Sequence, residues 1–249
     1  MICGLQKMTL LDYPGKIACT VFLGGCNFRC PFCHNSELFM GKPEKLMEDA
    51  EFFKFLQSRK GLLDGVCVSG GEPTLYKDLP DFMAKIKERG FLTKLDTNGS
   101  RPEVVRQLME KGLVDYIAMD VKNSPAKYAQ TVGLETMDMA PIEETLGLLI
   151  TGNTPYELRT TLISQLHDET SIQDMGVWLG SLVTGLKPKK LFLQSFVDRD
   201  TVLFAGLSAP EPETTREFVK ILEPFVGEVT IRNPKHNILC FGKKIPTRY

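Results

Sequence analysis

The sequence predicts an α/β fold in which parallel strands form a partial (β/α)6 barrel. The main observation is that short, β-branched apolar runs alternate with segments of helical periodicity along the chain. Strands joined by helices at this spacing pair in parallel through right-handed crossovers. Six such units are visible, fewer than the eight of a complete barrel. No linker, repeat or low-complexity tract divides the chain, so residues 1–249 are expected to form one domain.

Each element follows from a local pattern of residue types. Strands are expected where apolar, β-branched runs end in glycine or another turn residue. These runs are 16–25, 64–71, 91–100, 114–122, 156–163 and 189–196, with a short final strand at 228–233. Helices are expected where apolar residues recur at helical spacing, in places with proline near the start or glycine at the end. These segments are 48–60, 79–90, 101–112, 141–153, 171–185 and 212–226.

Composition excludes several classes of protein. Apolar residues make up 43% and charged residues 24% of the chain, as in ordinary globular proteins. The net charge of −1 gives no reason to expect a nucleic-acid or membrane partner. The N-terminus does not resemble a signal peptide, and no apolar run is long enough to span a bilayer. Seven cysteines, three of them bunched, suit metal binding in a reducing cytoplasm better than a disulfide framework.

Polar features follow the predicted strands at their carboxyl ends. The cysteine run follows the first strand, "SGGEP" the second, "DTNG" the third and "DVK" the fourth, while Arg159 lies in the fifth. In parallel α/β sheets and barrels, ligands bind at the carboxyl ends of the strands. These features are therefore expected to converge on one site.

The run "GGCNFRCPFCHN" places Cys26, Cys30 and Cys33 in a C-x3-C-x2-C spacing. Three thiolates on one short loop can hold three irons of a [4Fe-4S] cluster and leave the fourth iron open for a substrate. The alternative is a zinc site with a distant fourth ligand. Other candidates for a fourth ligand are His34, Cys3, Cys19, Cys67 and Cys240, of which Cys19 and Cys67 fit better as buried apolar residues.

The cysteine spacing, with Phe32 as its aromatic residue, is similar to the radical S-adenosylmethionine (SAM) signature. "CNFRCPFCHN" resembles the activating enzymes of glycyl-radical enzymes, and the resemblance extends over roughly residues 10–165. The opening "GLQKMTLLDYPGK…CHN" is similar to anaerobic ribonucleoside-triphosphate reductase activating proteins. The resemblance implies a barrel of the radical SAM type. It also implies that SAM chelates the open iron and, after one-electron reduction, yields methionine and a 5′-deoxyadenosyl radical.

The resemblance also implies a set of residues that bind the cofactor. "SGGEP" would contact the SAM amino group, and "DTNG" would lie beside its ribose and methionine portion. In the pyruvate formate-lyase activators, the corresponding Asp and Thr and the Asp of "DxK" also lie at a monovalent cation site, although Ala118 stands here where that family has a methionine. Arg159 would pair with the SAM carboxylate or an acid of the cation site. The expected cofactor-binding residues are Phe32, Asn35, Ser69, Gly70, Gly71, Glu72, Asp96, Thr97, Asn98, Asp120, Lys122 and Arg159.

Simpler explanations exist for several of these motifs. Glycines and Asn-Gly pairs are common in turns, and Asp120 with Lys122 could form a surface ion pair. Two carboxylates in one pocket, Asp96 and Asp120, would however repel each other unless a lysine or a bound cation compensated. Gln194 stands near the place of a family histidine, but the alignment there is poor.

The resemblance implies a partner protein that receives the radical. Anaerobic ribonucleotide reductase is the first expectation and pyruvate formate-lyase the second, with flavodoxin or ferredoxin as the one-electron reductant. The 36 residues between Cys33 and Gly70 leave no room for the cluster-bearing insertion of some relatives. Two other hypotheses remain at this stage, a radical SAM enzyme acting on a small molecule and a non-catalytic zinc-binding module.

Overall fold

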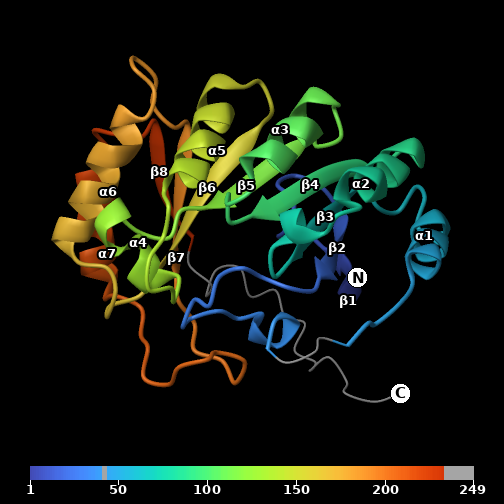
Figure 1. The fold of residues 1–249 in the computed structure, drawn as a ribbon, viewed down its shortest axis with the longest axis horizontal. Coiled ribbons are helices and arrows are strands. Elements are labelled where there is room, and N and C mark those ends of the chain that lie inside the picture. Colours follow the sequence, from blue (N-terminus) through green and yellow to red (C-terminus); the bar gives the residue numbers. More distant parts are fainter. Residues whose placement is uncertain (41–43, 233–249) are drawn as a thin grey trace.

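The computed structural model describes residues 1–40 and 44–232, which build one eight-stranded sheet in sequential order (Figure 1). Seven of its strands are parallel, and the first pairs antiparallel with the second. The strands are β1 (Ile2–Thr9), β2 (Ala18–Leu23), β3 (Gly65–Gly70), β4 (Leu92–Thr97), β5 (Tyr116–Asp120), β6 (Tyr156–Leu162), β7 (Lys190–Ser195) and β8 (Glu228–Arg232). Within the described residues β1 and β8 do not pair with each other, so the barrel is partial, as predicted.

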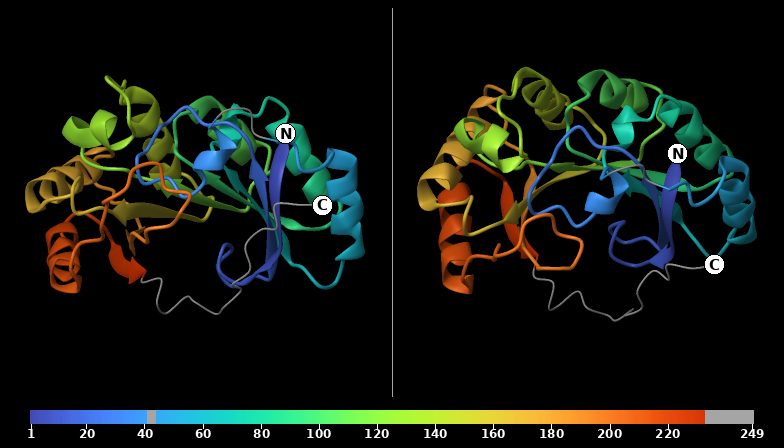
Figure 2. Two further views of the ribbon diagram at one scale, coloured as in Figure 1. Left: turned by 90° about the horizontal axis from the view of Figure 1, so that it is seen from below. Right: turned by 60° about the horizontal axis from the view of Figure 1, so that its bottom comes forward.

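The helices lie outside the curved sheet, which gives the molecule the outline of an arch (Figure 2). Its concave side holds the segments that follow β2 and β7. The α-helices are α1 (Asp49–Ser58), α2 (Leu79–Glu88), α3 (Pro102–Glu110), α4 (Pro125–Thr131), α5 (Ala140–Thr151), α6 (Glu169–Ser181) and α7 (Pro212–Leu222). There are also two 3-10 turns: Ser36–Leu38 follows the cysteine run, and Pro73–Leu75 begins at the last residue of the "SGGEP" motif.

The apolar core includes the layer between these helices and the sheet. Helix α2 shows why the amphipathic segments fold as predicted: its buried residues Leu79, Phe82, Met83 and Ile86 recur at helical spacing. Each large apolar side chain buried in this way contributes roughly 1.5–3 kcal/mol. This outer core leaves the concave face of the sheet free to carry polar residues.

Two elements were missing from the sequence prediction. Strand β1 has a mixed pattern of burial, with three exposed residues in its second half, so it lacks the alternation that marks a half-buried strand. Helix α4 has seven residues, too few for a helical period to be recognised. The thirteen predicted elements all occur, and their ends differ from the prediction by a few residues.

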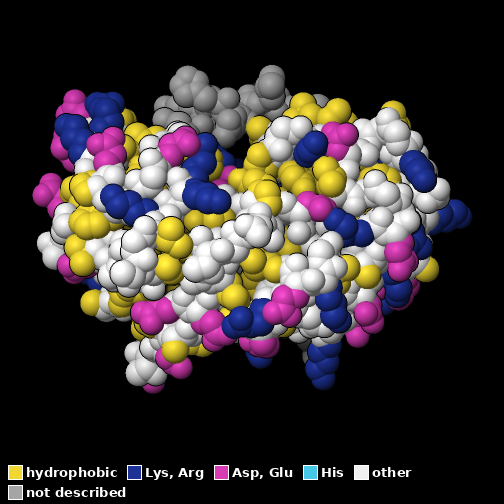
Figure 3. Space-filling view, turned by 90° about the horizontal axis from the view of Figure 1, so that it is seen from above, with side chains coloured by type: hydrophobic (Ala, Val, Ile, Leu, Met, Phe, Trp, Pro, Cys, Tyr) yellow, Lys and Arg dark blue, Asp and Glu magenta, His cyan; other side chains and the backbone are white. Residues whose placement is uncertain are grey.

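The surface is mixed in character. On the face in Figure 3, acidic and basic side chains are interspersed with hydrophobic ones. No helix in residues 1–40 and 44–232 combines the length and apolar character needed to cross a membrane.

Candidate active site

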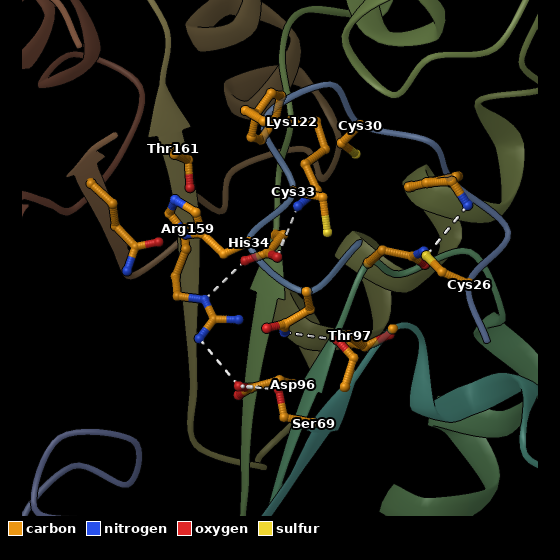
Figure 4. Close-up of a pocket in the computed structure, with 18 of the residues that line it drawn as sticks. Cys26, Cys30, Cys33, His34, Ser69, Asp96, Thr97, Lys122, Arg159 and Thr161 are labelled. Atoms are coloured by element: carbon orange, nitrogen blue, oxygen red, sulfur yellow. Dashed lines mark hydrogen bonds and ion pairs between the residues drawn. The ribbon is translucent and has the colours of Figure 1, made fainter. Parts of the chain in front are cut away.

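A cavity of about 400 Å³ lies at the carboxyl ends of the strands (Figure 4). It is lined by the ends of β3, β4 and β5 and the loops that follow them, by strands β6 and β7, and by the segments after β1, β2 and β7. Every residue that the sequence analysis predicted for the site lines this cavity except Glu72. The lining residues are Asp12, Cys26, Phe28, Cys30, Phe32, Cys33, His34, Asn35, Ser69, Gly70, Gly71, Asp96, Thr97, Asn98, Asp120, Lys122, Arg159, Thr161, Gln194 and Arg199.

The cysteine loop is held in place by hydrogen bonds from several directions. The backbone N–H of Arg29 donates to the carbonyl of Val132 at 2.8 Å, and that of Gly25 donates to Leu38 at 2.8 Å. The side-chain amide of Asn27 donates to the hydroxyl of Ser100 at 2.9 Å. The loop is therefore fixed by the protein itself.

The segment after β7 fastens the other side of the same loop. Nε2 of His34 lies 2.6 Å from the carbonyl oxygen of Val197, and its ring stacks on Phe196. The backbone N–H of Phe204 donates to the carbonyl of Pro31 at 3.2 Å. The His34 ring therefore packs against the segment after β7.

A glycine allows the loop after β3 to approach the cysteine loop. A Cβ atom added to Gly71 would lie 2.1 Å from the carbonyl oxygen of Gly25, so only glycine fits there. The Glu72 N–H donates to that same carbonyl at 2.8 Å. The predicted turn at "SGGEP" therefore also positions the backbone against the cysteine loop.

The three cysteine thiols share the cavity wall in a largely buried setting (Figure 4). Burial raises the pKa of Cys26 to about 11 and that of Cys30 to about 12, and it also raises the pKa of Cys33. Thiols buried in this way become thiolates when a nearby positive charge, such as that of a bound metal, compensates for the loss of solvent. The donor set therefore fits a soft metal group.

A zinc ion and an iron–sulfur cluster place different geometric demands on the thiols. A single zinc ion, with Zn–S bonds of about 2.3 Å, would draw its sulfurs to within roughly 4 Å of one another. In the described part of the chain, no three His, Cys, Asp or Glu side chains are gathered closely enough to hold one metal ion. Three thiols that line one cavity fit the separate irons of a cluster.

The other described cysteines are not part of the cavity lining. Cys19 and Cys67 are buried within β2 and β3, and Cys3 lies in β1. Cys240 is outside the described residues. Among the residues that the structure describes, the cavity is thus lined by three cysteines and no fourth.

Glu72 lies behind the cavity wall with 1% of its surface exposed. Its carboxylate accepts hydrogen bonds from Thr97 Oγ1 at 2.8 Å and from the backbone N–H of Asn98 at 2.6 Å, and from both the hydroxyl and the N–H of Thr74. The carboxylate expected to receive a ligand's ammonium is instead engaged in joining the loops after β3 and β4.

A row of alternating charges forms one side of the cavity. Arg159 joins two carboxylates, with Nε donating to Asp120 at 2.9 Å and an Nη atom 3.5 Å from Asp96. Lys122 Nζ donates to the other oxygen of Asp120 at 2.9 Å. Lys94 Nζ contacts the other end of the row, at Asp96.

These neighbours keep all five groups ionised. Burial alone would raise the pKa of Asp96 and Asp120, but Arg159 and the adjacent lysines outweigh it and hold both values below the usual range. Burial would likewise lower the pKa of Lys122 and Arg159, but the carboxylates hold both above their usual values. The row carries three positive charges against two negative ones.

Sequence reasoning missed several residues of this site. Asp12, Phe28, His34, Thr161 and Arg199 line the cavity in addition to those predicted, and Gln194 does so from β7. Asp12 lies in the "LLDYPGK" stretch, and the resemblance of that stretch to a known family was the one sequence feature that could have pointed to Asp12. Lys94 is two residues before Asp96, a spacing that places both side chains on one face of β4.

Comparisons with known proteins agree with this geometry. The sequence model of the Radical SAM superfamily matches residues 20–170. The chain is 34% identical over 241 residues to the "Putative glycyl-radical enzyme activating enzyme" of Methanocaldococcus jannaschii, covering 93% of this chain and 95% of that protein. It is 33% identical over 178 residues to the pyruvate formate-lyase-activating enzyme of Listeria monocytogenes, covering 66% of this chain and 69% of that protein.

A solved structure shows the same fold. The crystal structure of a domain of pyruvate-formate lyase-activating enzyme from Bacteroides vulgatus matches with a TM-score of 0.52 at 23% identity. The match covers 68% of this chain and 98% of that one.

Proposed function

Because the chain belongs to the radical SAM superfamily and to the glycyl-radical enzyme activating enzymes within it, we propose that it installs a glycyl radical on an anaerobic ribonucleoside-triphosphate reductase. The observation that carries this proposal is the cavity itself. It combines three cysteine thiols, with no fourth cysteine among the described lining residues, with a charged row able to hold a zwitterionic ligand. Residues 1–249 would act as one radical SAM domain, in keeping with the single sheet that spans residues 2–232.

Cys26, Cys30 and Cys33 would hold the [4Fe-4S] cluster of this family. When bound, the reduced cluster and SAM supply a 5′-deoxyadenosyl radical and methionine. One external electron would cleave the S–C5′ bond, and the glycine Cα–H bond would break as the C5′–H bond of 5′-deoxyadenosine forms. A flavodoxin or ferredoxin would supply the electron.

The chain's own residues would bind and orient SAM. Arg159 retains donor capacity beyond its contact with Asp120 and faces the cavity, so it can receive the methionine carboxylate. The carbonyl of Gly70 and the loop 96–98 would contact the amino group and ribose, in keeping with their position in the cavity lining. Asn35 donates to the Gly70 carbonyl at 3.1 Å, which orients that part of the wall, and Phe32 contributes an apolar surface.

Glu72 would support this site from behind. Its carboxylate accepts four hydrogen bonds from Thr74, Thr97 and Asn98, and it is not part of the cavity lining. We therefore assign it the role of fixing the loops that do face the cavity.

A monovalent cation is not part of the proposal. The resemblance implied a cation held by Asp96, Thr97 and Asp120. All four carboxylate oxygens of Asp96 and Asp120 have donors from the protein, and the Thr97 hydroxyl donates to Glu72 and accepts from the Gly99 N–H. This donor set does not fit a bound cation.

The choice of partner rests on the opening sequence of the chain. The stretch from "GLQK" to "CHN" is similar to the activating proteins of anaerobic ribonucleotide reductases. Pyruvate formate-lyase is the second candidate, because the activating enzyme of Listeria monocytogenes is 33% identical over 178 residues. A small-molecule substrate is the alternative within enzymes, and the match to the Radical SAM superfamily over residues 20–170 argues against the zinc-binding module.

The proposal is tested by electron paramagnetic resonance. Reconstituted protein, dithionite and SAM are incubated without oxygen with an anaerobic ribonucleotide reductase. The expected result is a glycyl-radical doublet, with one SAM consumed and one 5′-deoxyadenosine released per radical. The control reductase carries alanine in place of its radical glycine and should give no doublet.

Three other outcomes would change the assignment. A doublet on pyruvate formate-lyase alone would replace the partner but keep the reaction. SAM cleavage that couples only to a small metabolite would reject protein activation. One zinc per chain, without iron or sulfide, would support the binding module.

A further inference from the structure

Lys94 is a buried ammonium that the proposed reaction does not use directly. It lies in the middle of β4 with 1% of its surface exposed. Nζ contacts Asp96 and lies 3.7 Å from the thiol of Cys67 on the neighbouring strand. Lysine is almost never fully buried without a charged partner, so this position calls for a reason.

The ammonium remains charged in this setting. Burial would lower the pKa of Lys94, but the adjacent Asp96 carboxylate and the Cys67 sulfur outweigh it and hold the value above the usual one. The interaction is therefore an ion pair. Among the described residues, removing Lys94 would leave Asp96 with Ser69 at 3.1 Å and Arg159 at 3.5 Å.

Charge balance shows what the pair accomplishes. Without the two lysines, Arg159 would be the one positive charge that the described residues place between Asp96 and Asp120, two carboxylates that line the same cavity. Lys122 supplies the second positive charge on the Asp120 side. On the Asp96 side the corresponding charge comes from beneath the cavity, from Lys94.

We propose that Lys94 is a built-in substitute for a monovalent cation, so that this protein binds and cleaves SAM without potassium or sodium. Its ammonium, as a positioning group, fixes the orientation of the Asp96 carboxylate and keeps the cavity wall electrically balanced. Lys94 does not line the cavity and does not touch the ligand. The inference concerns SAM binding, so it holds whichever substrate receives the radical.

The wild-type protein provides the first test. SAM cleavage by reconstituted protein is measured in tetramethylammonium chloride, whose cation is too bulky to enter between carboxylates, and in potassium or sodium chloride at equal ionic strength. The expected rates agree within about twofold, the range of nonspecific salt effects on screened charges. A rate that requires potassium or sodium would overturn the proposal.

Two variants test the role of the ammonium. Lys94→Ala leaves room beside Asp96, and its SAM cleavage in tetramethylammonium should fall about tenfold or more, as expected for the loss of a charged hydrogen-bond partner. Potassium or ammonium ions should restore much of that rate. Lys94→Met fills the same space with an apolar chain, so it should show the loss without the rescue.

The unfolding temperature of the cluster-free protein distinguishes a lost cation substitute from a general loss of structure. The unfolding temperature of cluster-free Lys94→Ala should rise in potassium or ammonium relative to tetramethylammonium, because an ion that binds only the folded state stabilises it. The cluster-free wild type should show no such difference. Iron content of both variants after reconstitution reports whether the cysteine loop remains intact.

Lys87→Ala is the matched control. Lys87 pairs with Asp115 at 2.5 Å in a half-buried contact at the amino end of β5, outside the cavity. Its loss should leave SAM cleavage and its cation response unchanged. If Lys94→Ala matches the wild type in both buffers, or loses activity without any rescue, the substitution hypothesis fails. If Lys94→Ala does not fold, the hypothesis is tested by whether wild-type SAM cleavage is the same in tetramethylammonium as in potassium or sodium.

Discussion

Glu72 shows how one carboxylate can organise two loops. Its buried oxygens accept hydrogen bonds from Thr74, Thr97 and Asn98, so the loops after β3 and β4 are joined through a single side chain. Hydrogen bonds to a charged acceptor are each worth about 1.5–3 kcal/mol, and a buried donor without an acceptor costs a similar amount. The free energy of unfolding should therefore depend on this residue.

We expect Glu72→Gln to lower the free energy of unfolding of the cluster-free protein by about 2–3 kcal/mol, because the new amide group would face N–H and O–H donors. Chemical denaturation measures the change. Glu217→Gln, at the exposed partner of Lys220, should change stability by less than about 0.5 kcal/mol. Unchanged stability of Glu72→Gln together with weaker SAM binding would instead indicate the direct ammonium contact that the sequence suggested.

The cysteines also differ in a way that can be tested. Cys26→Ala, Cys30→Ala and Cys33→Ala should each abolish retention of iron and sulfide, since all three thiols line the cavity. Cys19→Ala should keep the iron, because its thiol is buried within β2 and contributes only packing. Iron and sulfide analysis with visible absorbance measures both. Iron retention that needed Cys3 or Cys19 equally would contradict a cluster with an open iron.

The sequence could predict some site residues better than others. The three cysteines were predictable because their ligand spacing is local. Arg159 was predictable because a charge within an apolar strand needs a partner. The SAM contact predicted for Glu72 stays a prediction, because its hydrogen bonds to Thr97 and Asn98 on another loop could not be read from a local pattern. Lys94 was overlooked although Asp96 is only two residues away, because its burial cannot be read from the sequence. Charge balance across several strands depends on the register of the sheet, which no local pattern specifies.

At the level of elements, the strands and helices follow from periodicity, whereas the contacts between loops do not. Each predicted strand occurs because β-branched runs recur between amphipathic helices. The segment after β7 contacts the cysteine loop through Val197 and Phe204, which are more than 160 residues from the loop in sequence. Such long-range contacts leave no signal in composition or period, so the cavity's outer wall could be found only from the structure.

At the scale of the whole molecule, the open sheet determines how a substrate reaches the site. The described strands stop short of a closed barrel, with β1 and β8 at the two edges of the sheet. A complete eight-stranded barrel is filled by side chains, while this one retains a cavity of about 400 Å³ at the carboxyl ends of its strands. A glycine on a peptide loop could therefore approach a bound SAM directly, whereas a large folded surface would have to dock outside.

This geometry predicts that a short peptide is a poor but genuine substrate. Hydrogen transfer requires the glycine Cα to come within roughly 3–3.5 Å of C5′, which a flexible peptide can achieve without the rest of its protein. It would lack the docking contacts and would lose more conformational entropy on binding. We expect kcat/KM for a peptide spanning the reductase's radical glycine to be about 100-fold below that of the whole reductase, a difference of about 2.7 kcal/mol.

The measurement follows 5′-deoxyadenosine that carries deuterium from a peptide labelled at the glycine Cα. Deuterium transfer from this peptide, and none from a peptide with unlabelled glycine, would show that the abstracted atom comes from the expected position. The same peptide with alanine at that position tests access, because its methyl group must fit in the near-attack contact. Deuterium transfer at a rate equal to that of the whole reductase would mean that docking contributes nothing. Its complete absence, while the whole reductase still acquires its radical, would mean that the partner must reshape the cavity before the glycine can enter.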